Sequence, residues 1–113
     1  MTELLETHLK KIEREKEKKR IELLRKISDA LNKLSEEITF REAYIFGSVL
    51  KPRKFYYDSD IDIAVSGLAN KDFFLFMSRL ADLLGRDIDV LQIEKHRLKD
   101  KIIKEGLLWK RQN

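Results

Sequence analysis

The sequence predicts an α/β (α+β) fold, a small mixed sheet of three or four strands flanked by helices, with one long helix at the N-terminus. Apolar residues recur at steps of three and four through the first 37 residues, which is the period of a helix. Three later segments alternate as strands do, and an amphipathic segment separates two of them. Helices and strands that alternate in this way pack as layers around one core.

The composition indicates a single folded domain. The chain has 113 residues, of which 42% are hydrophobic and 39% charged, so we expect one small domain over 1–113. No apolar run approaches the roughly 18 residues that span a bilayer, and the first residues lack the order of a signal peptide. We therefore expect a cytoplasmic protein with no membrane contact. The absence of cysteine excludes disulfides and thiolate metal sites.

Charge is distributed unevenly along the chain. The net charge is +4 overall, −2 over residues 41–94 and +5 over residues 95–113. The basic end either attracts an anionic partner, such as nucleic acid or a nucleotide, or only keeps the last helix soluble. The second interpretation is preferred, and nucleic-acid binding is not favoured.

The first helix is expected over residues 3–37, as one helix or as two with a weak joint. Its buried stripe consists of Leu24, Ile27, Leu31, Leu34 and Ile38, and a similar stripe upstream consists of Leu5, Leu9 and Ile12. The segment between the two stripes is strongly charged and should be solvated. The first turns therefore either fray as a charged helix or project from the domain to bind a partner.

Further elements follow from turn residues and periodicity. "REAYIFG" predicts a strand that ends at Gly47, and "SDIDIAVSG" predicts a second strand that ends at Gly67. A helix follows over 70–85, with Asn70 as its N-cap and Gly85 as its C-terminal stop. The helix contributes five residues to the core: Phe73, Phe76, Met77, Leu80 and Leu84.

The C-terminal third completes the sheet. "RDIDVLQI" predicts a third strand, residues 96–105 a last helix, and "LLWKR" a short edge strand. Trp109 is expected to pack in the core or at the edge. His8 and His96 lie on charged segments away from the motif described next, so we interpret them as surface residues.

Two aspartates stand within the second strand. Side chains alternate across a strand, so Asp60 and Asp62 share a face and lie roughly 6–7 Å apart. Aspartate is a poor strand former, whereas paired carboxylates suit a hard cation such as Mg²⁺. The third strand repeats the pattern with Asp87 and Asp89. Three converging acids predict a two-metal site for phosphoryl or nucleotidyl transfer, and an acidic solvent-facing sheet is the alternative.

Other acidic motifs are excluded by their missing residues. The one-three-five spacing of Asp58, Asp60 and Asp62 is that of a calcium loop, but Ile63 replaces the required glycine and Ala69 the required glutamate. "GSVLKPRK" lacks the second glycine and the Lys-Ser/Thr pair of a Walker loop.

A phosphate-binding segment precedes the aspartates. Gly47 permits close approach of backbone N–H groups to an anion, and Ser48 adds a hydroxyl donor. Lys51, Arg53 and Lys54 bring further positive charge for a triphosphate. A phosphate cradle followed by an acidic strand is difficult to explain by packing alone.

A Gly-Ser turn, a loop of about ten residues and then Asp-x-Asp on a strand resembles the signature of the DNA polymerase β-like nucleotidyltransferase superfamily. The segments "SDIDIAV" and "LLGRDIDVLQIE" are most similar to those of its minimal nucleotidyltransferases, which are small single-domain proteins. The resemblance covers about residues 41–108, so the expected domain consists of a charged N-terminal helix, 1–38, and a catalytic core, 41–108.

The resemblance implies roles for residues and partners. Gly47 and Ser48 match the phosphate-binding motif, and Asp60 and Asp62 match the carboxylates that bind Mg²⁺, with two ions implied. Asp89 best matches the third carboxylate, with Asp87 second. Members of this type are often antitoxins that transfer AMP from ATP to a tyrosine of a HEPN ribonuclease toxin, which implies ATP as substrate and a HEPN toxin as partner.

The sequence departs from the family pattern after the turn. Many relatives carry a small residue, arginine and glycine there, whereas this chain reads "VLKPRK", so Lys51 or Arg53 takes the place of that arginine. Three alternatives to protein AMPylation remain open: an antitoxin that acts by contact alone, a nucleic-acid-binding module, and nucleotidyl transfer to RNA or a small molecule.

Overall fold

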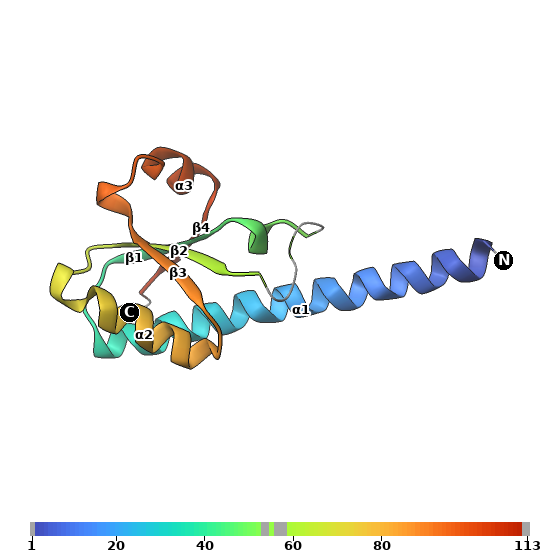
Figure 1. The fold of residues 1–113 in the computed structure, drawn as a ribbon, viewed down its shortest axis with the longest axis horizontal. Helices are drawn as coiled ribbons and strands as arrows, with labels where there is room; N and C mark the ends of the chain where they lie inside the picture. Colours follow the sequence, from blue (N-terminus) through green and yellow to red (C-terminus); the bar gives the residue numbers. More distant parts are fainter. Residues whose placement is uncertain (1, 53–54, 56–58, 112–113) are drawn as a thin grey trace.

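The computed structural model describes residues 2–52, 55 and 59–111. Its helices and strands are, in chain order, α1 (Thr2–Glu37), β1 (Glu42–Phe46), β2 (Ile61–Ser66), α2 (Phe73–Leu84), β3 (Ile88–Gln92), α3 (Lys99–Glu105) and β4 (Leu107–Lys110) (Figure 1). Short 3₁₀ turns lie at η1 (Ser48–Leu50), η2 (Asn70–Asp72) and η3 (Ile93–Lys95). This arrangement confirms the predicted mixed fold with a long N-terminal helix.

The sheet is four-stranded and mixed, in the order β3-β2-β1-β4. β1 runs antiparallel to both β2 and β4, and β2 runs parallel to β3. A parallel pair needs a crossover connection, and α2 provides it. β4 is the predicted edge strand beside β1. Figure 1 shows α1 and α2 on one side of the sheet and α3 on the other.

The two faces of the sheet pack into two apolar clusters of different size. On β2, Ile61, Ile63 and Val65 join the larger cluster, which includes buried residues of α1 and α2. The alternate residue Ala64 joins a smaller cluster that includes Ile102 of α3 and Tyr44 of β1. Because side chains alternate along a strand, Asp62 falls on the same face as Ala64, the face that carries α3.

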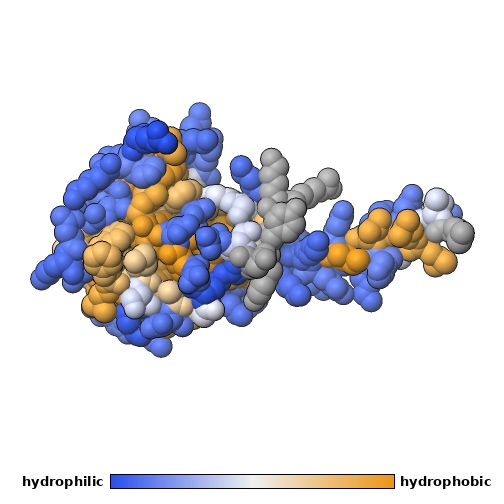
Figure 2. All heavy atoms as spheres, in the orientation of Figure 1, coloured by the Kyte–Doolittle hydropathy of each residue, from blue (hydrophilic) through white to orange (hydrophobic). Residues whose placement is uncertain are grey.

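The long helix α1 is continuous, so the prediction of one helix holds and that of two with a joint does not. Its second half packs on the sheet through Leu23, Ile27, Leu31 and Leu34. Its first half extends beyond the sheet, and the molecule measures 59 Å along one axis but 27 and 26 Å along the others. Apolar side chains remain exposed on this half (Figure 2), among them Leu4, Leu5 and Leu9.

Two predicted helix starts are wrong. Asn70 does not cap α2: a 3₁₀ turn intervenes, the N-cap residue is Asp72, and the Asn70 amide oxygen instead accepts hydrogen bonds from Gln92 and Lys95. The last helix begins at Lys99 rather than at residue 96, because residues 96–98 form a turn in which the Leu98 N–H donates to His96 Nδ1 and the Lys99 N–H donates to the His96 carbonyl.

Other local predictions are confirmed. Gly85 ends α2 in the left-handed conformation, with φ 65°, where glycine is favoured. Trp109 packs in the core beside Phe40, and its ring N–H donates to the Asn32 side-chain oxygen at 2.8 Å. Within the described part of the chain, no helix is long and apolar enough to cross a membrane.

Candidate active site

The predicted site residues gather where β1 ends and where β2 and β3 begin. Because β1 is antiparallel to β2, its last residue Phe46 pairs with Asp62. Because β3 is parallel to β2, Asp62 also pairs in register with Asp89. The sheet topology therefore sets the two aspartates side by side on one face, as directly opposed residues of neighbouring strands.

Gly47 lies directly against the Asp62 carboxylate. Its φ of 85° is a conformation that L side chains rarely adopt. A Cβ atom added at this glycine would stand 2.4 Å from Asp62 Oδ2. Both the backbone conformation and the close approach require glycine, which explains why a glycine ends β1.

The electrostatic environment of Asp62 disfavours its charge. Burial is the main cause that raises the pKa of the Asp62 carboxyl, and the neighbouring carboxylates of Asp89 and Asp60 raise it further. Asp62 is half-buried, whereas Asp60 and Asp89 are exposed. A cation near these oxygens would offset both the burial and the repulsion.

Asp60 and Asp87 lie just before their strands. Together with Asp89 they line a shallow depression of 580 Å³ between α2 and the start of β3. Among the described residues, no three or more His, Cys, Asp or Glu side chains are arranged to hold a metal. The sheet register therefore pairs Asp62 with Asp89, and the charge of Asp60 also raises the pKa of Asp62.

The donor set of this pair fits Mg²⁺. Magnesium binds oxygen ligands, and it commonly uses one or two carboxylates while water and substrate phosphates complete its coordination. Asp62 and Asp89 supply such carboxylates, and a half-buried acid whose charge is disfavoured gains from a bound cation.

The predicted phosphate-binding residues are only partly described. Ser48 opens the η1 turn, whose backbone closes through Leu50 N–H to Gly47 O at 3.2 Å and Lys51 N–H to Ser48 O at 2.9 Å. The side chain of Ser48 is half-buried and that of Lys51 is exposed. Arg53 and Lys54 lie outside the described residues.

A comparison of sequences decides the family. The profile described as "Polymerase beta, Nucleotidyltransferase" matches residues 25–113, well over half of the chain. The chain belongs to this family. Its sheet order, its Gly-Ser turn and its paired aspartates thus occur in a nucleotidyltransferase domain. No curated protein matches the chain significantly.

Two solved structures resemble this nucleotidyltransferase. One is a crystal structure of a toxin-antitoxin with AMP-PNP, which is 26% identical, with a TM-score of 0.61 over 75% of this chain and 74% of the other. The second was assigned provisionally as a minimal nucleotidyltransferase. It is also 26% identical, with a TM-score of 0.59 over 76% of this chain and 92% of the other. Both agree with the minimal branch of the family.

Sequence reasoning missed two arginines, one that contacts the η1 turn and one that contacts Ser59, the residue before Asp60. Arg20 of α1 donates to the backbone carbonyl of Val49 at 3.0 Å. Arg86, which precedes β3, donates to the carbonyl of Ser59 and lies over the Phe55 ring, 5.9 Å from its centroid. Each contact joins residues 27 or more positions apart, so local patterns contain no signal for it.

Proposed function

We propose that this chain is a Mg²⁺-dependent nucleotidyltransferase that transfers AMP from ATP to a tyrosine hydroxyl of a HEPN-type toxin and so acts as an antitoxin. The observation that carries the proposal is the contact of Gly47, Asp62 and Asp89 at one end of the sheet. Family membership and the structural likeness to a toxin-antitoxin with AMP-PNP support it.

In this proposal the turn binds the nucleotide and the strand acids bind the cation. The backbone and hydroxyl of Gly47 and Ser48 hold the triphosphate, and Lys51, Arg53 and Lys54 add positive charge. Asp62 and Asp89, which the sheet register pairs, would hold Mg²⁺. The family resemblance adds Asp60 as a third carboxylate and a second ion to this expectation. Bound Mg²⁺ supplies charge neutralisation on the triphosphate and on the leaving pyrophosphate.

The chain's own residues then position the reaction. The acceptor oxygen forms a bond to the α-phosphorus, the bond between the α-phosphorus and the bridging oxygen to the β-phosphate breaks, and pyrophosphate leaves. Asp89 is exposed at the edge of the site, where its carboxylate can take the proton of the acceptor hydroxyl. Asp62, half-buried beside Gly47, would be one of the carboxylates that hold the cation.

Labelled nucleotides test this function. The protein is incubated with Mg²⁺, ATP and the product of the neighbouring reading frame. Label in the α-phosphate should appear on the partner and label in the γ-phosphate should not. A Tyr→Phe change at the labelled position of the partner should abolish transfer. Transfer of the γ-label, or of neither label, would refute the proposed reaction.

A second candidate is an antitoxin that neutralises the same toxin by contact alone. The exposed leucines Leu4, Leu5 and Leu9 on the projecting half of α1 favour it, since they offer apolar surface that no other described residue covers. The two functions separate in Asp62→Asn, which should lose neutralisation if AMP transfer is required and keep it if contact suffices.

A further inference from the structure

We propose that Arg20, on the long helix, is a positioning residue that holds the nucleotide-binding turn in its working conformation. The inference rests on the proposed function, because it assigns Gly47 and Ser48 to the triphosphate. Its basis is one contact: the guanidinium of Arg20 donates from Nη1 to the carbonyl of Val49 at 3.0 Å, inside the η1 turn.

The guanidinium is itself held in place. Arg20 Nε donates to Glu17 Oε2 at 3.0 Å, and a second bond joins Nη2 to Glu17 Oε1. This two-point bond leaves Nη1 aimed at the turn, because the planar guanidinium has a fixed fork. The Arg20 side chain is only 12% exposed, whereas that of Glu17 is 35% exposed, so the guanidinium is the more shielded partner of the pair.

The turn depends on this outside contact. The carbonyls of Gly47 and Ser48 accept hydrogen bonds within the turn, and that of Val49 accepts the bond from α1. The Val49 side chain is buried in the core, so the turn is held by packing on one side and by Arg20 on the other. The η1 turn follows Gly47 directly, and any rotation of it moves the backbone beside the Asp62 carboxylate.

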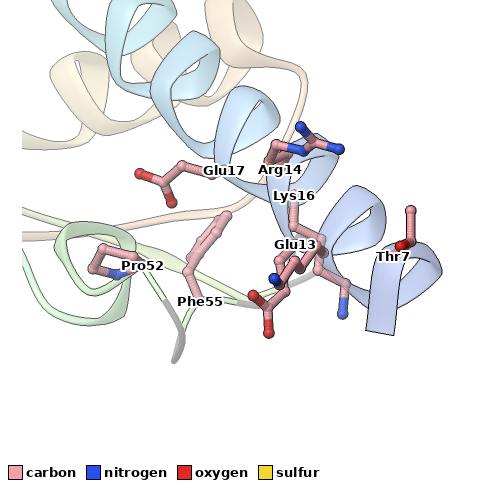
Figure 3. Close-up of a pocket in the computed structure, with 8 residues that line it drawn as sticks. Thr7, Glu13, Arg14, Lys16, Glu17, Pro52 and Phe55 are labelled. Carbon is pink, nitrogen blue, oxygen red and sulfur yellow. The ribbon is translucent and has the colours of Figure 1, made fainter. Parts of the chain in front are cut away.

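Toward the N-terminus of α1, the helix does not pack against the described residues that follow the turn. A cleft of 620 Å³ separates α1 from Pro52 and Phe55 there (Figure 3). Glu13 and Glu17 line the helix side of this cleft. Glu17, which orients Arg20, therefore lies at the edge of the cleft. Arg20 thus ties the helix to the turn at the boundary between the packed and the projecting half of α1.

Arg20→Met tests the inference because it keeps the length of the apolar stem and removes every donor. At a temperature where each variant is fully folded, its Kd for Mg²⁺-AMP-PNP should rise about tenfold relative to the native chain. Arg20→Lys keeps the charge and one donor to Val49 but not the fork to Glu17. Its Kd should therefore lie between those of the native chain and Arg20→Met.

Arg25→Met is the matched control. Arg25 forms the same i,i+3 pair, with Glu22 at 3.6 Å, but both side chains are more than half exposed. The Kd of this variant should stay within twofold of the native value. An unchanged Kd in Arg20→Met, or an equal loss in Arg25→Met, would overturn the positioning role.

Hydrogen exchange separates this inference from the proposed function. The backbone N–H groups of Leu50 and Lys51 should exchange faster in Arg20→Met than in the native chain, without nucleotide present, whereas those of β4 should not. Unchanged exchange at the turn would refute the clamp even if nucleotide binding fell. A native chain that binds no Mg²⁺-AMP-PNP would instead refute the proposed function and the nucleotide role of Arg20 with it.

Discussion

At each end of strand β2 a glycine with positive φ lies beside an acidic side chain, but the pKa of the acid is raised at one end and lowered at the other. At its start, Gly47 with φ 85° touches Asp62, whose pKa is raised by burial and by the charges of Asp89 and Asp60. At its end, Gly67 with φ 72° donates its N–H to Glu94 at 2.8 Å. That hydrogen bond is the main cause that lowers the pKa of Glu94.

The difference between the ends separates stability from function. The acid at the end of β2 is satisfied, by a backbone donor and by the nearby charges of Arg41 and Lys99. The acid at the start is crowded by like charge, which costs folding free energy unless a cation binds. Groups kept in such unfavourable states concentrate at functional sites, and replacing them often stabilises the fold.

The largest difference between the two ends of β2 should appear when Asp62→Asn is compared with Glu94→Gln. Asp62→Asn should lower AMP transfer by at least about a hundredfold, because it removes a charge that faces the cation. The same change should raise the melting temperature of the metal-free protein by a few degrees, since it relieves repulsion; stabilising changes of this class contribute about 0.5–2 kcal/mol.

Glu94→Gln should behave in the opposite way. Its melting temperature should fall, because a charged acceptor is lost, and its transfer rate should stay within about twofold of the native rate. Calorimetry and the label assay measure both quantities. A melting temperature that falls in Asp62→Asn would contradict the interpretation of Asp62 as destabilising.

A comparison of Asp89→Asn with Asp87→Asn shows which aspartate at the start of β3 is the third carboxylate of the site. Asp89 is the register partner of Asp62, whereas Asp87 precedes the strand. Asp89→Asn should therefore lower the transfer rate by at least about 10–100-fold, the loss that even an outer partner of a metal ligand causes. Asp87→Asn should have less than a threefold effect. The reverse ranking in initial-rate measurements would assign the third carboxylate to Asp87.

Gly47→Ala against Gly67→Ala compares two strained glycines. Both lie at positive φ, and an added Cβ would stand 2.4 Å from Asp62 Oδ2 in one and 2.8 Å from Arg41 Cβ in the other. Each change should destabilise the fold by about 1–3 kcal/mol. Only Gly47→Ala should also raise the KM for ATP, by about tenfold, because it displaces an acid of the site. Equal KM values in the two folded variants would contradict the assignment.

The pH dependence of stability should differ in sign between the two acids. The folded pKa of Asp62 lies above its ordinary value of 3.8, so its contribution to stability is full below 3.8 and is lost as the pH rises through the folded pKa. The folded pKa of Glu94 lies below 4.5, so its contribution is full above 4.5 and is lost as the pH falls through the folded pKa.

Thermal melts of the metal-free protein across pH 3–8, roughly, should show these trends as small shifts. The advantage of Asp62→Asn over the native chain should grow with rising pH, and the deficit of Glu94→Gln should vanish in acid. A constant difference across the range would show that neither carboxyl titrates differently in the folded chain.

Most of the fold followed from periodicity, and the exceptions are local. The stripes of α1 and α2 and the alternation of β2 predicted helices and strands because burial on one face imposes those periods. The core is smaller than predicted: on α2 only Phe76 and Leu80 are buried, while Phe73, Met77 and Leu84 are partly buried, and on α1 the upstream residues Leu5 and Leu9 are exposed. Asn70 was expected to cap a helix, but the Gln92 and Lys95 side chains, some 22 to 25 residues away, take its oxygen. Local propensity carries no information on such partners.

The site was predictable as a set of residues but not as an arrangement. Asp60, Asp62 and Asp89 stood out because acids are rare on strands. Their inequality comes from the sheet register, which pairs Asp62 with Asp89 and leaves Asp60 outside the strand. Arg20 gave no sequence signal, because its role depends on a contact with Val49 that only the packing of α1 creates.

Binding of AMP-PNP by calorimetry, with and without Mg²⁺, tests the central claim most directly. The native chain should bind only when Mg²⁺ is present. Asp62→Asn and Asp89→Asn should bind much more weakly than the native chain under the same conditions, while Glu94→Gln should bind as the native chain does. Equal binding by the native chain without Mg²⁺, or by Asp62→Asn with it, would contradict the claim that these two strand acids hold the metal-nucleotide complex.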